Sequence, residues 1–189
     1  MEAILEATTR ILRQDGLAAV NTNRVAELAG VSVGSLYQYF PSREAILAEL
    51  VRRLRLSMSG RLAAASRAMQ TRPLTEAIPV MMAAAVHAYE TEPRLTAALE
   101  EAEARLPRDP DVMAGRRAVK EAMIACLGRH GFTDPGEAAM DIVAMTRGIV
   151  MASIAGGPPD FASVRRRIER AALGYLEGCP RVGQSPSLA

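Results

Sequence analysis

The chain has 189 residues, 49 % of them apolar, and a formal net charge of +2, so it can form a sizeable core but has no strongly basic field that would indicate a nucleic-acid partner. Its two cysteines, Cys126 and Cys179, lack the spacing of a zinc site, so we expect no disulfide framework, no metal and no cofactor. The sequence opens with no basic leader and contains no run of about 18 apolar residues, which predicts a cytoplasmic protein with no membrane span.

Helical periodicity dominates the sequence. Apolar residues recur every three or four positions almost throughout, and no run alternates with a period of two. We therefore predict an all-α fold, divided by glycine and proline residues into about nine helices. Because the first three helices are short, we expect a small N-terminal unit over residues 1–45 and a larger helical body over residues 46–178. Residues 179–189, rich in Pro, Gly and Ser, are expected to form a flexible tail.

A sharp turn between two short helices is predicted around Gly30. Thr22 is expected to cap the first helix, and Gly30, in a left-handed conformation, to end it. Ser32 can cap the second helix, and Val31 and Leu36 then have the spacing of a hydrophobic staple, which fixes the entry angle. The stretch therefore predicts a helix-turn-helix.

Aromatic residues crowd into the second of these helices. Tyr37, Tyr39 and Phe40 are three of only seven aromatic residues in the chain. Leu36 and Phe40, four positions apart, are expected to face inward and leave small and polar residues outside. Such a face can enter the major groove of DNA, where tyrosine hydroxyls suit phosphate oxygens and Gln38 can both donate and accept at a base edge. Packing of the tyrosines in a miniature core is the alternative interpretation.

The same stretch resembles the DNA-binding domain of TetR-family transcriptional regulators over about 45 residues. The residues that carry the resemblance are Gly16-x5-Thr22-x2-Val25-Ala26-x2-Ala29-Gly30-Val31-Ser32-x-Gly34-x-Leu36-Tyr37-x-Tyr39-Phe40-x-Ser42-Arg43-Glu44-x2-Leu47. The resemblance implies phosphate contacts from Thr22, Tyr37, Tyr39 and Arg43, and base contacts from Asn23, Val33, Gly34, Ser35 and Gln38. Arg24 is either a further DNA contact or a solvated surface charge.

The body is expected to bind a small, largely apolar effector. A long helix over residues 44–69 would connect the N-terminal unit to this body. Methionines adapt to variable apolar shapes, and polar groups on apolar helices can orient a ligand. The candidate ligand residues are Met58, Met81, Met82, His87, Tyr89, Met113, Met123, Met145 and Arg147. Core packing is the alternative role for each of them.

Two apolar C-terminal helices suggest an interface between chains. An apolar stripe runs from Phe161 to Tyr175 beside a run of arginines, which we expect to form a solvated face. The resemblance implies that these helices pair with their mates in a four-helix homodimer interface. The expected interface residues are Ala144, Gly148, Ala152, Phe161, Val164, Ile168, Ala171, Ala172 and Tyr175.

These features favour a homodimeric repressor that binds a palindromic double-stranded operator and is released by the effector. A helix-turn-helix regulator controlled by a protein partner is an alternative. An all-α enzyme is a weaker one, because the sequence has no zinc motif, phosphate-binding glycine loop or nucleophile–base set. The acidic cluster Glu100-Glu101-Glu103 lies in a polar stretch that we expect to be exposed, which also gives no catalytic site.

Overall fold

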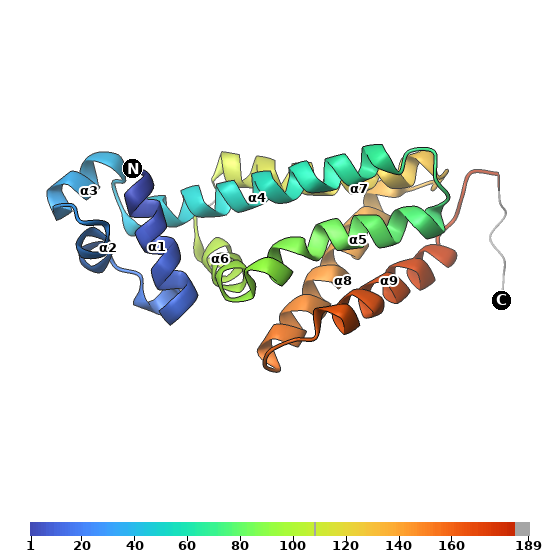
Figure 1. Ribbon diagram of the computed structural model, residues 1–189. Helices are drawn as coiled ribbons and strands as arrows, with labels where there is room; N and C mark the ends of the chain where they lie inside the picture. Colours follow the sequence, from blue (N-terminus) through green and yellow to red (C-terminus); the bar gives the residue numbers. More distant parts are fainter. Residues whose placement is uncertain (108, 184–189) are drawn as a thin grey trace. The chain divides into compact units, whose positions relative to one another are not determined.

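The computed structural model describes residues 1–107 and 109–183. These residues form nine α-helices and one short 3-10 helix, with a single isolated bridge and no sheet, so the predicted all-α fold is confirmed (Figure 1). The elements are α1 (Glu2–Asp15), the 3-10 helix η1 (Leu17–Ala19), α2 (Thr22–Ala29), α3 (Val33–Tyr39), α4 (Arg43–Ala68), α5 (Leu74–Thr91), α6 (Pro93–Arg105), α7 (Pro110–Arg129), α8 (Pro135–Ala155) and α9 (Phe161–Glu177).

By packing, the chain divides into two compact units. Unit 1 comprises Met1–Leu56 together with Thr91–Gly115, and unit 2 comprises Ser57–Glu90 and the chain from Arg116 onward. Two of the three boundaries between these units fall inside α4 and α7, so both helices contribute to both units, and the third falls before Thr91, the last residue of α5. The functional boundary expected near residue 45 stays a prediction.

Unit 1 contains the predicted N-terminal helices and one helix that the sequence had placed in the body. α1 packs against α2, η1 and α6. Ala98, Leu99 and Ala102 of α6 are buried in the same apolar cluster as Ile4 and Leu36. The N-terminal helices therefore complete their core with α6, although about 50 residues of sequence separate α6 from α3.

A buried ion-pair cluster joins α4 to α6 and corrects the expectation that Glu100 and Glu103 are exposed. Arg55 donates through Nη2 to Glu100 Oε1 at 2.7 Å and through Nε to Glu103 Oε2 at 3.0 Å. The side chains of Arg55, Glu100 and Glu103 are 9 %, 1 % and 7 % exposed. Of the acidic cluster only Glu101 remains exposed, paired with Arg105 on the same helix. Gly115 allows α7 to lie against this arginine, because a Cβ at position 115 would sit 2.6 Å from the Arg55 Cβ.

Exposed ion pairs also tie α1 to the rest of unit 1. Arg53 of α4 donates to Glu2 of α1 at 2.6 Å, and Arg13 of α1 donates to Glu92, just before α6, at 2.6 Å. The hydrogen bond from Arg53 lowers the pKa of Glu2 below its ordinary value. A carboxyl whose pKa is lower in the folded chain stabilises the fold at neutral pH, and this contribution is lost as the pH falls through the acidic range.

In unit 2, α8 and α9 lie side by side, and their contact corrects one expectation about the dimer interface. Val164, Ile168 and Ala172 are only 1–2 % exposed, so the apolar stripe of α9 is covered by its own chain. Tyr175 at the end of the stripe is half-buried and donates to Asp141 of α8 at 2.7 Å, which raises the pKa of Tyr175. The stripe therefore belongs to the core of unit 2 and leaves no large apolar patch in water.

The segment after α9 begins with ordered contacts. The Thr133 N–H donates to the Pro180 carbonyl at 3.1 Å, and the Val182 N–H donates to the Gly131 carbonyl at 2.8 Å. The Arg181 guanidinium lies over the Phe132 ring, 4.7 Å from its centroid. The expected tail is thus held at its start to the loop after α7, and its residues 184–189 lie outside the described part of the chain.

Candidate nucleic-acid interface

The turn between α2 and α3 has the geometry predicted from the sequence, with one correction. Gly30 has φ +67° and ψ +31°, the left-handed conformation that ends α2. The side chain of Asn21 caps α2 by accepting from the Arg24 N–H at 2.9 Å. Thr22, the residue expected to cap, is instead the first residue of the helix. Its hydroxyl is therefore available for other contacts.

The second helix, α3, is held at its start by a cap and along one side by the core. The Ser32 hydroxyl accepts from the Ser35 N–H at 3.0 Å, as expected of a capping residue. Leu36 is fully buried and Phe40 is 6 % exposed, so the predicted inward face is confirmed. The opposite face is exposed and consists of Val33, Gly34, Tyr37, Gln38 and Tyr39.

The structure brings together two of the expected phosphate-contacting residues from different helices. The Thr22 hydroxyl of α2 and the Tyr37 hydroxyl of α3 lie 3.2 Å apart. Tyr37 is 48 % exposed and Tyr39 is 58 % exposed, so the tyrosines do not fill a miniature core. Because each hydroxyl both donates and accepts, the pair can rearrange so that both donate to one anionic oxygen.

The two arginines of this region already have partners within unit 1. Arg24 forms an ion pair with Asp15 at the end of α1, and both side chains are about 40 % exposed. Arg43 donates to two backbone carbonyls, those of Leu17 and Val20. Neither set of contacts could be predicted from the sequence, because the residues around an arginine do not indicate which distant acceptor it will bond to. Asn23 is exposed on α2 and Ser35 is half-buried on α3, so both lie near the exposed face.

The residues expected to bind an effector differ widely in burial. Met81, Met82, Met123 and Tyr89 are buried, and Met82 Sδ accepts from the Thr146 hydroxyl at 3.6 Å. Among the other candidates, Met58 is buried, His87 and Met145 are half-buried and Arg147 is exposed. Met113 is 37 % exposed and belongs to unit 1, so it is not in the compact unit that holds the other methionines.

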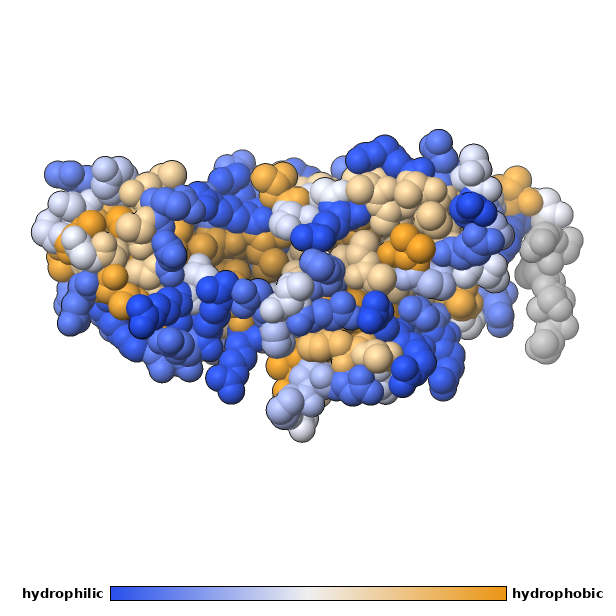
Figure 2. Space-filling view, viewed as in Figure 1, coloured by the Kyte–Doolittle hydropathy of each residue, from blue (hydrophilic) through white to orange (hydrophobic). Residues whose placement is uncertain are grey.

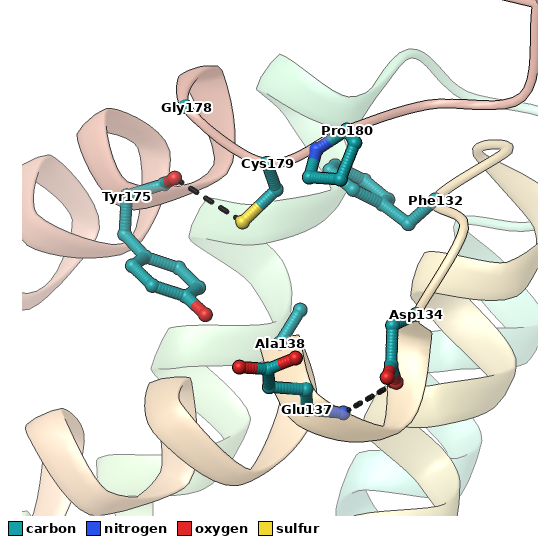
Figure 3. Close-up of a pocket in the computed structure, with 8 residues that line it drawn as sticks. All are labelled: Phe132, Asp134, Glu137, Ala138, Tyr175, Gly178, Cys179 and Pro180. Atoms are coloured by element: carbon teal, nitrogen blue, oxygen red, sulfur yellow. Dashed lines mark hydrogen bonds between the residues drawn. The ribbon is translucent and has the colours of Figure 1, made fainter. Parts of the chain in front are cut away.

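Unit 2 has a surface hollow of about 370 Å³ that none of the expected effector residues lines. Figure 3 shows its walls, which come from the start of α8, the end of α9 and the two segments next to them. The lining residues are Phe132, Asp134, Glu137, Ala138, Tyr175, Gly178, Cys179 and Pro180. Two hydrogen bonds join lining residues to one another: the Cys179 thiol donates to the Tyr175 carbonyl at 3.4 Å, and the Glu137 N–H donates to the Asp134 carboxylate at 2.8 Å. In the described part of the chain, no three His, Cys, Asp or Glu side chains are grouped so as to hold a metal.

One face of α8 is apolar and uncovered. The helix is long and apolar enough to cross a membrane, judged by length and composition alone. Only 28 % of its most apolar 18-residue stretch is buried in the protein, so most of that stretch is not covered by its own chain. Ala144, Gly148 and Ala152 are exposed, and Met140 on the same helix is 54 % exposed. A Cβ added at Gly148 would meet no atom within 4 Å. In Figure 2 apolar residues reach the surface among polar ones where α8 and α9 lie.

The N-terminal region and the C-terminal region of the chain each match a family model. Residues 4–50 match the model of the bacterial regulatory proteins of the tetR family, and residues 73–176 match a tetracyclin repressor-like C-terminal domain. Nucleoid occlusion factor SlmA from Actinobacillus pleuropneumoniae is 35 % identical over 71 residues, which are 37 % of this chain and 35 % of that protein. The HTH-type transcriptional repressor KstR from Mycolicibacterium smegmatis is 50 % identical over 44 residues, 23 % of this chain and 22 % of that one.

These curated relatives match this chain over about a third of their own length or less. Likeness over the whole fold comes from solved structures. The crystal structure of a transcriptional regulator from Rhodococcus sp. Rha1 has a TM-score of 0.74 at 22 % identity and covers 94 % of this chain and 96 % of that one. At that identity the likeness shows the fold alone.

Proposed function

Because the chain belongs to the tetR family of bacterial regulatory proteins, and is therefore a DNA-binding transcriptional regulator, we propose that it is a cytoplasmic repressor that binds a palindromic operator as a homodimer. The observation that carries this proposal is the exposed face of α3, beside which the Thr22 and Tyr37 hydroxyls meet. KstR, a relative over part of the chain, is named a transcriptional repressor, which supports repression as the outcome of binding.

We divide the DNA contacts between backbone and bases. The hydroxyls of the two tyrosines of α3 and of the threonine of α2 suit contacts to phosphate oxygens. Such contacts fix the register of the protein on the duplex without reading its sequence. Thr22, Tyr37 and Tyr39 take this role. Residues at the start and on the outer face of α3 approach base edges in the major groove, with Asn23 beside them on α2. The base-contacting residues are Asn23, Val33, Gly34, Ser35 and Gln38.

Replacing Gln38 with alanine is expected to relax the sequence preference at one base pair in each half-site. Gln38 is exposed on α3, and its amide can bond two atoms of one base edge, so its loss costs about 1–3 kcal/mol against the preferred base only. Selection of binding sites from random duplexes by the two proteins measures this change. Gln14→Ala, an exposed glutamine of α1, is the matched control and should leave the profile unchanged. An unaltered profile for Gln38→Ala would exclude it as a base reader.

The second chain is proposed to cover the exposed face of α8. Large uncovered apolar patches are uncommon on monomers, and a two-fold axis places the same small residues of both chains opposite one another. Ala144, Gly148 and Ala152 then allow close approach of the two copies of α8, and the half-buried Ala171 adds to the interface from α9. A two-fold dimer reads a palindrome, since each chain contacts one half-site.

Release by a small, largely apolar effector is proposed to act through unit 2, whose core contains Met81, Met82 and Met123. A ligand shifts the protein only by its difference in affinity for the DNA-bound and released conformations. We expect such a ligand to lower operator affinity by about 5- to 150-fold. Fluorescence anisotropy of labelled operator, titrated with a compound found by thermal-shift screening, measures this effect. A compound that binds unit 2 and leaves operator affinity unchanged would instead favour control by a protein partner.

Control by a protein partner is the second candidate because of one comparison. SlmA, named a nucleoid occlusion factor, is 35 % identical over 37 % of this chain. A regulator controlled in this way would keep the same DNA contacts and need no effector.

A further inference from the structure

Arg43, the first residue of α4, is joined to the chain just before α2. Its Nε donates to the Val20 carbonyl at 2.7 Å, and its Nη2 donates to the Leu17 carbonyl at 2.9 Å. Leu17 and Val20 are buried, with 5 % and 3 % of their surface exposed, and they lie at the two ends of the turn formed by η1. The Arg43 side chain is only one third exposed. One side chain thus holds both ends of the turn.

This turn leads directly into the DNA-contacting residues. Val20 precedes Asn21, whose side chain caps α2, and Asn21 precedes Thr22, whose hydroxyl lies 3.2 Å from that of Tyr37 on α3. A displacement of the turn would therefore move the start of α2 and separate the two hydroxyls. Contacts of this kind have to be held within about half an ångström to act together.

The geometry of the contact requires arginine and not merely a positive charge. Nε and Nη2 donate from one edge of a rigid, planar group, so they can reach two carbonyls in fixed directions at once. Lysine carries the same charge as a single point at the end of a flexible stem, and it cannot reproduce this two-point contact. A residue that served only to neutralise a phosphate would be replaceable by lysine.

We propose that Arg43 is a positioning residue for DNA reading, which fixes the start of α2, and with it the Thr22–Tyr37 hydroxyl pair, to the start of α4. The inference rests on the proposed operator binding. It replaces the role implied by family resemblance, in which Arg43 contributes its charge to a phosphate, with a role inside unit 1.

The first arm of the test compares Arg43→Lys and Arg43→Ala for operator affinity at several salt concentrations. Because both variants lose the two-point contact, each is expected to bind at least about tenfold more weakly, with the lysine variant closer to the alanine variant than to the original protein. The dependence of affinity on salt should not change. Arg52→Lys, a charge-preserving change elsewhere on α4, should bind as the original protein does.

The outcome that overturns the proposal is rescue by lysine. If Arg43→Lys binds closer to the original protein than to Arg43→Ala, charge is sufficient. The same conclusion follows if Arg43→Ala lowers the slope of log affinity against log salt by about 0.9, the value of one phosphate contact. Should Arg43→Ala not fold, Arg43→Gln takes its place as the uncharged variant.

The second arm uses the free protein and needs no operator, so it separates failure of this inference from failure of the proposed function. In a ¹H–¹⁵N spectrum the Arg43 Nε–H should give a resolved signal that exchanges slowly with water and disappears in Arg43→Lys. The amides of Arg24 and Val25, which bond to Asn21, should exchange at least about tenfold faster in that variant. An Nε–H that exchanges as fast as that of the exposed Arg10, or amide rates that do not change, would overturn the proposal.

Discussion

Arg55→Ala is expected to lower the free energy of unfolding by about 3–5 kcal/mol, the usual cost of removing one partner from a buried ion pair. Glu100 is 2 % exposed, and the side chain of Glu103 is 7 % exposed. Without Arg55 these two buried carboxylates would lose their positively charged partner on α4. Urea denaturation followed by circular dichroism measures the difference, and thermal melting should fall with it.

The matched control for this prediction is Arg105→Ala. Arg105 pairs with Glu101 on the same helix, but both side chains are exposed, by 70 % and 49 %. Exposed pairs contribute less than about 1 kcal/mol, so this variant should be nearly as stable as the original protein. The combined variant Arg55→Met, Glu100→Gln, Glu103→Gln should recover much of the loss, since it leaves no buried charge. Equal effects of Arg55→Ala and Arg105→Ala would show that the cluster does not hold α6 to α4.

Gly148→Glu is expected to convert the proposed homodimer to a folded monomer and to weaken operator binding by about 10²–10⁴-fold, the gain that linking two binding modules provides. A side chain at position 148 meets no atom within 4 Å in its own chain, so the fold of the protomer should be unaffected. At the proposed interface the same side chain would place a charge between two copies of α8. Sedimentation equilibrium gives the oligomeric state, and anisotropy with labelled operator gives the affinity.

Ala125→Glu is the control for the dimer prediction, because Ala125 is exposed on α7 of the same unit, outside the proposed interface. It should remain dimeric and bind operator normally. Ile168→Glu is not a suitable test, since Ile168 is 1 % exposed inside unit 2 and a charge there should unfold the unit. A Gly148→Glu protein that stays dimeric would remove α8 from the interface.

The helix-turn-helix could be predicted from sequence because each of its signals is local. Gly30 needs only its own left-handed conformation, and Ser32 caps through a bond that spans three residues. Leu36 and Phe40 share a face by their spacing alone. The one error in this region, Thr22 in place of Asn21 as the cap, is a shift of one residue between two residue types that both cap helices well.

What the sequence left open depended on contacts between distant residues. Arg55 and Glu100 are 45 positions apart, and a run of glutamates has the same pattern whether it is solvated or paired in a core. Arg43 meets carbonyls 23 and 26 positions away. Periodicity shows that α9 has an apolar stripe but not which surface covers it. In the structure the stripe of α9 lies in the core of unit 2, whereas the small residues of α8 are exposed.

Selection of binding sites from random duplex DNA by the original protein tests the central claim most directly. The account predicts one enriched palindrome whose half-sites lie about 34–36 Å apart along the duplex, or a multiple of that distance, because a two-fold dimer presents one α3 to each half-site. Recovery of an enriched site without two-fold symmetry, or of no sequence above the starting pool, would contradict it.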